Sequence, residues 1–217
     1  MKVKVCGMKE ESSLEAVTAL GPDALGFIFY EKSPRHVLPF LSPARVRSLA
    51  VPEKVGVFVD ALPDDMRRQA EAFGLTTIQL HGNETPDTAA RLRADGLKVW
   101  KVFGVGPAFD FGAVRPFEGV VDHLLFDTAG PKAGGNGYAF PWQVLDQYTG
   151  ETTFLLSGGI GPDSLEALSA FSHPRWAGID LNSRFEIRPG EKDPARLAEF
   201  IAAFRQLVSQ KNNILLP

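Results

Sequence analysis

Short runs of apolar, β-branched and aromatic residues recur along the chain at intervals of roughly 20 to 30 residues, the pattern of successive short strands. An interval of this length is what a parallel strand followed by a crossover helix requires. The pattern predicts eight β-strands, at residues 3–6, 24–29, 54–59, 76–80, 98–102, 123–127, 153–156 and 177–181.

The segments between these strands have helical periodicity, and six of them start with the same device. Each has a proline at its expected first helical position, directly after the expected cap residue. These pairs are Ser42-Pro43, Leu62-Pro63, Thr85-Pro86, Phe140-Pro141, Gly161-Pro162 and Asp193-Pro194. Proline suits the first helical position, where an N–H would lack a partner, and a preceding Ser, Thr or Asp caps the free amides. The last helix has the clearest apolar stripe, made of Leu197, Phe200, Ile201, Phe204, Leu207 and Val208.

Eight strands alternating with about eight helices predict the α/β class and a single (β/α)8 TIM barrel domain over residues 1–217. A doubly wound open sheet is the alternative, although the first strand is not followed by the G-x-G-x-x-G pattern of such folds. In a barrel the loops after the strands form the active site. The residues that end each apolar run are therefore the candidates for chemistry.

Composition narrows the class of protein. The chain is 44% apolar, and its 23 basic and 26 acidic residues are scattered without blocks, which indicates neither a nucleic-acid nor a membrane partner. No stretch approaches the length of about 18 apolar residues that spans a membrane. The single cysteine excludes an intramolecular disulfide and is typical of the cytoplasm, where we expect the protein. Whether it is a monomer or a homodimer stays open.

Cys6 ends the first predicted strand, directly before Gly7. Strand alternation places it on the face of Lys4 and opposite Val3 and Val5, so it faces the barrel interior if the valines face the helices. A nearby ammonium would lower the thiol pKa and favour a thiolate that could act as a general base or nucleophile. A lone cysteine is also commonly just a small buried apolar residue.

Asp127 ends the sixth strand on the same face as Leu125, and residues 134–137, Gly-Gly-Asn-Gly, follow it closely. Partial burial behind the apolar run would raise the pKa of this carboxyl and keep some of it protonated, as a general acid requires. The plainer alternative is a loop or helix-capping carboxylate.

Two glycine-rich or polar loops follow strands seven and eight. Gly158-Gly159 and Asn182-Ser183 lie where barrels of this kind commonly bind phosphate through backbone N–H groups. Arg35, after strand two, could form a bidentate pair with a substrate carboxylate. None of His36, His81, His123 and His173 has a second ligand at metal-binding spacing, so no metal site is predicted.

Taken in order, these stretches resemble phosphoribosylanthranilate isomerase, a barrel enzyme of tryptophan biosynthesis. The resemblance rests on Lys4-Val5-Cys6-Gly7, Gly26-Phe27-Ile28-Phe29, Ser33-Pro34-Arg35, Val55-Gly56-Val57-Phe58, Gln79-Leu80-His81-Gly82-Asn83-Glu84, Leu125-Phe126-Asp127, Gly134-Gly135-Asn136-Gly137, Ser157-Gly158-Gly159 and Gly178-Ile179-Asp180 through Pro189-Gly190. The chain departs from many members at Tyr138-Ala139 and at Asn182-Ser183-Arg184.

The resemblance implies an Amadori rearrangement of N-(5-phosphoribosyl)anthranilate that needs neither metal nor cofactor. It implies that Cys6 is the general base, Asp127 the general acid and Arg35 the ligand of the anthranilate carboxylate. Phosphate binding falls on Gly158, Gly159, Asn182 and Ser183, and further substrate contacts on His81, Gly135 and Asp180.

Four other interpretations compete with this one. An indole-glycerol-phosphate synthase would need a catalytic lysine near a strand end, for which Lys101 is the closest candidate, and a pentose-phosphate epimerase would need paired aspartates with metal-binding histidines. A related aminoaldose isomerase of histidine biosynthesis would use paired carboxylates. A non-catalytic sugar-phosphate sensor would keep the glycine loops but would have no reason to bring Cys6 and Asp127 together.

Overall fold

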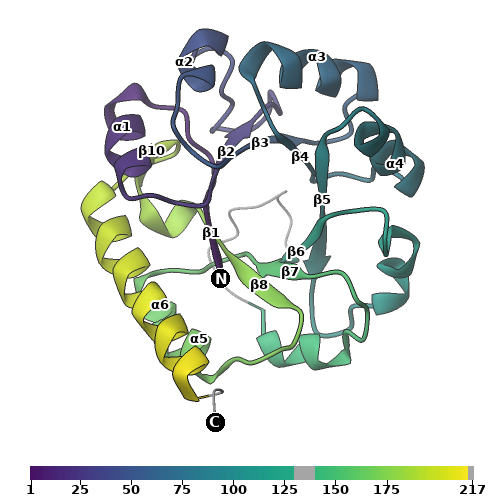
Figure 1. Ribbon diagram of the computed structural model, residues 1–217, viewed down its shortest axis with the longest axis vertical. Helices are drawn as coiled ribbons and strands as arrows, with labels where there is room; N and C mark the ends of the chain where they lie inside the picture. The colour runs from purple at the N-terminus through teal and green to yellow at the C-terminus, as the bar shows by residue number, and fades with distance from the viewer. Residues whose placement is uncertain (130–139, 215–217) are drawn as a thin grey trace.

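The computed structural model describes residues 1–129 and 140–214, with side chains up to residue 211. Eight parallel strands pair in sequence order, and β1 pairs with β8 to close a barrel, which Figure 1 shows nearly end-on. The strands are β1 (Lys2–Val5), β2 (Ala24–Ile28), β3 (Glu53–Phe58), β4 (Thr77–Leu80), β5 (Lys98–Val105), β6 (His123–Thr128), β7 (Phe154–Leu156) and β8 (Trp176–Leu181). All eight predicted strands and the barrel are confirmed, and the largest shift in an end is at β5.

The helices surround the barrel (Figure 1). They are α1 (Glu11–Ala19), α2 (Pro43–Arg47), α3 (Pro63–Phe73), α4 (Pro86–Ala94), α5 (Leu165–Ala170), preceded by the 3-10 helix η4 (Pro162–Ser164), and α6 (Pro194–Ile214). The predicted caps are present where a side chain can make them. Ser42, Thr85 and Asp193 accept hydrogen bonds from backbone N–H groups one turn later, at 3.2, 3.3 and 3.1 Å.

The helix expected after Phe140-Pro141 is wrong. This segment forms the 3-10 helix η3 (Trp142–Gln147), and the β5–β6 connection holds only η1 (Phe111–Ala113) and η2 (Arg115–Phe117). Aromatic rings cover this side of the barrel instead. Phe111 packs edge-on against Phe126 with ring centroids 5.9 Å apart, so bulky rings bury the outer face of β6 without a full helix.

The side chains of β1 alternate between the outside and the inside of the barrel, as the sequence predicts. Val3 and Val5 belong to the apolar layer between barrel and helices, whereas the fully buried Lys4 reaches Asp180 across the β1–β8 seam. The barrel interior has its own small apolar cluster, Ala24, Val55, Trp100, Val102, Leu125 and Leu155. The charged groups near the carboxyl ends therefore rest on a packed core.

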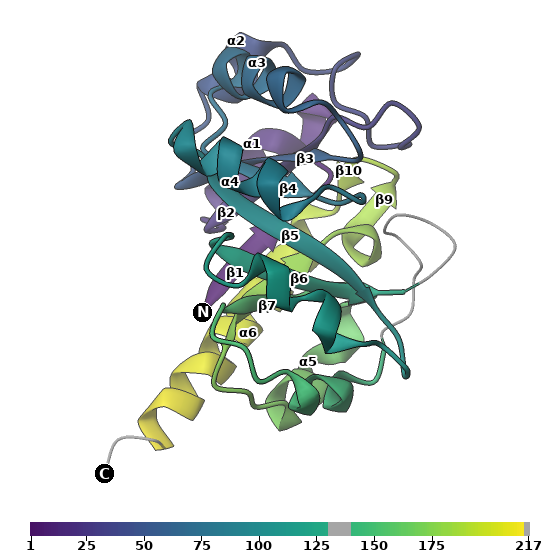
Figure 2. The ribbon, with the colours of Figure 1, turned by 90° about the vertical axis from the view of Figure 1, so that its right-hand side faces the viewer.

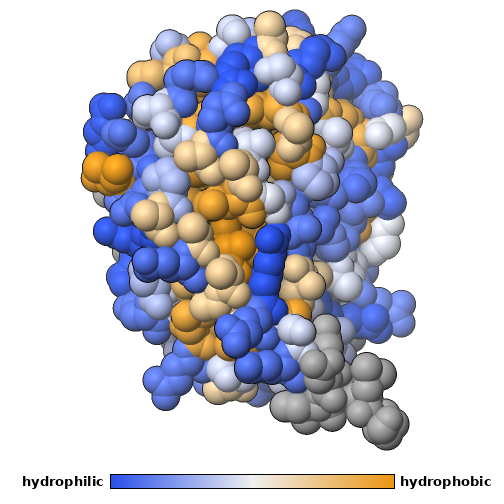
Figure 3. Space-filling view, turned by 60° about the vertical axis from the view of Figure 1, so that its left-hand side comes forward, coloured by the Kyte–Doolittle hydropathy of each residue, from blue (hydrophilic) through white to orange (hydrophobic). Residues whose placement is uncertain are grey.

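A short antiparallel hairpin, β9 (Glu186–Arg188) with β10 (Glu191–Lys192), follows β8. Figure 2 shows it at one end of the barrel, on the side away from the N-terminus. The face in Figure 3 is mostly hydrophilic, with a band of apolar residues through its middle. In the described part of the chain, no helix has both the length and the apolar character to cross a membrane.

Candidate active site

One cavity opens among the carboxyl ends of the strands, with a volume of about 700 Å³ including its mouth. Residues from seven of the eight strand ends and the loops after them converge on it, as expected for a barrel of this type. It is lined by Cys6, Ile28, Tyr30, Ser33, Arg35, Val57, Val59, Gln79, His81, Asp127, Ser157, Gly158, Gly159, Ile160, Asp180, Asn182 and Ser183. The proposed base, acid and arginine are therefore walls of the same cavity.

Cys6 is held at the end of β1 by its backbone. Its N–H donates to the carbonyl of Leu181 at 2.8 Å, which continues the pairing of β1 with β8. A Cβ built on Gly26 of β2 would lie 2.7 Å from the Cys6 sulfur, so the thiol occupies the space that this glycine leaves. Cys6 is 4% exposed, and its accessible side is the cavity.

The expected lowering of the Cys6 pKa is wrong. Burial disfavours the thiolate and raises the pKa above its ordinary value, although the Lys4 ammonium acts in the opposite direction. The sequence correctly indicated Lys4 as the neighbour of Cys6. It could not show how completely the Cys6 thiol and the Lys4 ammonium are removed from water.

Asp127 is 6% exposed, and its Oδ1 accepts the N–H of Thr128 at 2.8 Å. Burial, assisted by the negative charge of Asp180, raises the pKa of this carboxyl to about 6. The predicted rise is confirmed. At neutral pH a useful minority of Asp127 is still protonated.

Lys4 and Asp180 form an ion pair at 2.8 Å on the floor of the site. Burial would disfavour the ammonium, but Asp180 and Cys6 together outweigh it, and the pKa of Lys4 is raised. The Ser157 hydroxyl also donates to Asp180, at 3.4 Å. This pair sets a fixed positive and a fixed negative charge beneath Cys6 and Asp127.

His81 follows β4 and points toward the acid, with its Nε2 3.7 Å from Asp127 Oδ2. Burial, with Lys4 and Lys101 nearby, lowers the pKa of His81 to about 4, so the imidazole is neutral at physiological pH. The amide of Gln79 lies 3.2 Å from Nδ1. With that amide nitrogen as donor, the proton of His81 is on Nε2 and faces Asp127.

The two predicted phosphate loops lie side by side at the cavity. Gly158 and Gly159 both have positive φ, +83° and +70°, which brings bare backbone to the cavity wall. Within the described residues their N–H groups have no acceptor. Arg184, where the chain departs from the family pattern, binds both oxygens of Asp163 at 3.0 Å and so links the loop after β8 to the loop after β7.

Asn182 and Ser183 line the same cavity. The Asn182 side-chain oxygen accepts a 2.7 Å hydrogen bond from Lys192 of β10. Arg35 also lines the cavity, but its guanidinium is partly occupied by Glu186 at the start of β9, with a shortest distance of 2.6 Å. Gly135 lies outside the described residues.

Sequence reasoning missed several cavity residues or their partners, notably Gln79, Ser157, Glu186 and Lys192. Alternation along β4 from Thr77 through Gln79 to His81 could have identified Gln79. No local pattern indicates that Glu186 folds back onto Arg35, because the two are far apart in sequence.

Comparison with known proteins decides the family. Residues 3–203 match the family model described as N-(5'-phosphoribosyl)anthranilate (PRA) isomerase. The chain belongs to the phosphoribosylanthranilate isomerase family. It is 47% identical over 203 residues to the N-(5'-phosphoribosyl)anthranilate isomerase of Parabacteroides distasonis, covering 93% of this chain and 92% of that protein.

Solved isomerases of the same family share the fold. The Thermus thermophilus enzyme is 31% identical with a TM-score of 0.77, covering 95% of this chain and all of that one. Another phosphoribosylanthranilate isomerase, 26% identical with a TM-score of 0.76 and covering 95% of this chain and 99% of that one, was solved in complex with reduced 1-(o-carboxyphenylamino)-1-deoxyribulose 5-phosphate. The family resemblance and the barrel are thus both confirmed.

Proposed function

We propose that this chain converts N-(5-phosphoribosyl)anthranilate into 1-(2-carboxyphenylamino)-1-deoxyribulose 5-phosphate, with Asp127 as general acid and Cys6 as general base. The observation that carries the proposal is that both side chains line one cavity, together with Arg35 and the glycine loop after β7. A sensor for sugar phosphates would need the loop but not this pair.

The substrate has two anionic ends, and the cavity offers a partner for each. The backbone N–H groups of Gly158 and Gly159 suit the phosphate, while the Arg35 guanidinium suits the anthranilate carboxylate. Binding at both ends would fix the ribose between Cys6 and Asp127. Such positioning is itself a large part of catalysis.

In the first step Asp127 donates its proton to the furanose ring oxygen, and the ring opens to an iminium at the carbon that bears the aryl nitrogen. The neighbouring C2 proton becomes acidic, and the Cys6 thiolate removes it to give an enolamine. Tautomerisation gives the ketose. Asp127 has then lost one proton and Cys6 has gained one, so exchange with solvent resets the pair.

Neutral His81 and the Lys4–Asp180 pair support this assignment. A protonated imidazole beside Asp127 would hold the carboxyl ionised, whereas His81 is uncharged at neutral pH. We assign to Asp180, which is 7% exposed and on the cavity wall, a hydrogen bond with a ribose hydroxyl. Because a thiol base must remain reduced, the proposal also fits a cytoplasmic location.

Generating phosphoribosylanthranilate in situ and following the decay of its fluorescence tests the proposal. We expect decay well above the spontaneous rate, and a loss of about 10²-fold or more in kcat for Cys6→Ser, the usual scale for a positioned base. Decay at only the spontaneous rate with the unaltered protein would favour a binding protein instead. Near-normal turnover by Cys6→Ser would remove the role given to the thiol.

A further inference from the structure

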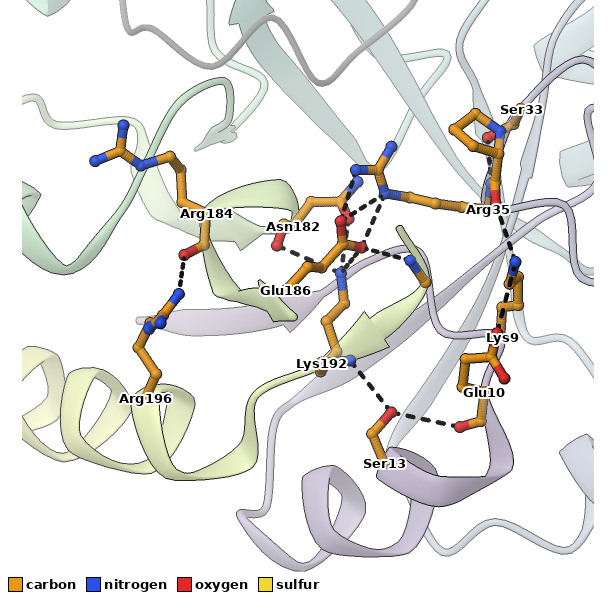
Figure 4. A network of polar contacts seen from close by, with 12 residues as sticks. Lys9, Glu10, Ser13, Ser33, Arg35, Asn182, Arg184, Glu186, Lys192 and Arg196 are labelled. Atoms are coloured by element: carbon orange, nitrogen blue, oxygen red, sulfur yellow. Dashed lines mark hydrogen bonds and ion pairs between the residues drawn. The ribbon is translucent and has the colours of Figure 1, made fainter. Parts of the chain in front are cut away.

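The Arg35 guanidinium is held on one edge by the protein itself. Its Nε and Nη2 atoms both bond to the Glu186 carboxylate, at 2.9 and 2.6 Å (Figure 4). Nε and Nη2 form the side edge of the guanidinium, so the end edge, formed by Nη1 and the second N–H of Nη2, is left over. Among the described residues, Nη1 has no hydrogen-bond partner.

Glu186 is itself fixed from three sides. Besides Arg35, its Oε1 accepts from Lys192 Nζ at 2.7 Å and from the Gly190 N–H at 3.0 Å, and its side chain is 4% exposed. Glu186 and Lys192 are opposite each other in the β9–β10 hairpin. Burial would raise the pKa of this carboxyl, but Arg35 and Lys192 outweigh it and lower the pKa, so Glu186 is a carboxylate.

The rest of Arg35 is equally constrained. Its N–H donates to the Ser33 hydroxyl at 3.1 Å, and a Cβ on Gly7 would lie 2.7 Å from Arg35 Cδ. The methylene stem therefore packs on the bare backbone of Gly7. The guanidinium has little freedom, and Arg35 is one of the residues that line the cavity.

We infer that Glu186 and Lys192 are positioning residues for carboxylate recognition: Glu186 fixes the plane of Arg35 with its end edge free, and Lys192 keeps the group attractive to anions. The inference deepens the proposed function and rests on Arg35 binding the anthranilate carboxylate. Arg35 and Glu186 alone would sum to zero charge and would repel a second carboxylate about as much as attract it. Burial lowers the pKa of Lys192 to about 8, so this side chain, with 0% exposure, is still mostly protonated at neutral pH and restores a net charge close to +1.

A simpler account makes the opposite prediction. If Glu186 merely competes with substrate for Arg35, Glu186→Gln frees the guanidinium and tightens binding of a carboxylate ligand. If Glu186 orients Arg35, the same change weakens binding, because the glutamine amide accepts only through one oxygen and loses the charge-assisted fork. The direction of the effect separates the two.

Two inhibitors provide the readout. Reduced 1-(o-carboxyphenylamino)-1-deoxyribulose 5-phosphate carries the carboxylate, and its phenylamino analogue lacks it. The ratio of their inhibition constants measures carboxylate recognition alone. We expect Glu186→Gln to reduce this preference about tenfold, the scale of one lost charge-assisted hydrogen bond, and to raise KM more than it lowers kcat. A purely structural role would weaken both inhibitors equally and would overturn the inference, as would tighter binding of the carboxylate inhibitor.

The double variant Glu186→Gln/Lys192→Met separates orientation from charge and avoids leaving a lone buried ammonium. Arg35 then supplies the same net charge of +1 without its anchor. Loss of the carboxylate preference supports orientation, and an unchanged preference overturns it. Glu191→Gln is the matched control, because Glu191 lies in the same hairpin but pairs with Arg188, at 2.6 Å, rather than with Arg35.

The Arg35→Ala variant distinguishes a failure of the proposed role of Arg35 from a failure of the positioning role of Glu186. If it leaves the carboxylate preference intact, the role of Arg35 in the proposed function is wrong, and the inference falls with it. If Arg35→Ala abolishes the preference and Glu186→Gln does not reduce it, only the inference is wrong. If Glu186 acts through Arg35, adding Glu186→Gln to Arg35→Ala causes no further loss of preference.

Discussion

Replacing Asp127 by asparagine is expected to stabilise the protein while abolishing its activity. The side chains have nearly the same shape, and an asparagine Oδ1 can still accept the N–H of Thr128. What disappears is an ionised group in a buried site. The pKa of Asp127 is raised from 3.8 to about 6, so the folded protein holds a proton on this residue more tightly than the unfolded chain does.

The magnitude follows from linkage. Stability falls as pH rises between the two pKa values, because the folded state binds more protons there, and the full cost is present above about pH 6. At 1.36 kcal/mol per pH unit, the difference corresponds to about 3 kcal/mol at pH 7.5 and about 1.5 kcal/mol at pH 5. The free energy of unfolding of Asp127→Asn should exceed that of the parent by up to these amounts, because an amide does not ionise.

Urea unfolding at the two pH values measures the gain, and the fluorescence assay measures the loss. We expect kcat to fall by about 10²-fold or more, because asparagine cannot donate a carboxylic proton to the ring oxygen. Asp146→Asn, an exposed acid on η3, removes the same charge at the surface and should change neither quantity appreciably. A variant no more stable than the parent at pH 7.5 would refute the burial argument for Asp127.

Three further outcomes are expected. Gly158→Ala should raise KM and cost about 1–3 kcal/mol of stability, because φ is +83° there and the new Cβ would overlap Thr128; unchanged inhibition by inorganic phosphate would contradict the loop's role. Lys4→Met should cost about 3–5 kcal/mol by leaving Asp180 buried without its partner; urea unfolding measures this, and a loss below about 1 kcal/mol would show that Asp180 is solvated. A plot of kcat/KM against pH should fall as the pH drops below about 6 and stay flat across neutral pH. A fall in kcat/KM as the pH rises above 6 would contradict the raised pKa of Cys6.

Much of this structure follows from local patterns in the sequence. A closed barrel follows from the number and spacing of apolar runs, and the inward direction of Cys6 and Asp127 follows from alternation along β1 and β6. The covering of the barrel between β5 and β7 could not be predicted from local sequence patterns. Proline at position 141 is compatible with α and 3-10 geometry alike, and the rings of Phe111 and Tyr148 cover the sheet in place of a helix.

The site's charge network is beyond local patterns for a different reason. The contact of Arg35 with Glu186 joins loops after β2 and β8, and that of Lys4 with Asp180 joins β1 to β8. Both exist only because the barrel closes. The sequence shows these four charged residues but not which of them pair. Nor does it show how completely Cys6 is buried, and burial sets the sign of the pKa shift on Cys6.

That sign determines how the site must work. With the pKa of Asp127 near 6 and that of Cys6 above its ordinary value, most molecules at neutral pH hold an ionised Asp127 and a protonated Cys6. The productive form has the proton on Asp127 instead. The two forms carry the same net charge, so their ratio does not change with pH between the two pKa values, and activity across neutral pH is limited by this fixed fraction rather than by titration. Lys4 lowers the pKa of Cys6 more than Asp180 raises it, and Asp180 raises the pKa of Asp127 more than Lys4 lowers it. The buried pair thus enlarges the productive fraction at both residues. This role accounts for the pair on the floor of the site better than stability does, because replacing a whole buried ion pair by apolar residues is often neutral, although removing one partner alone is costly.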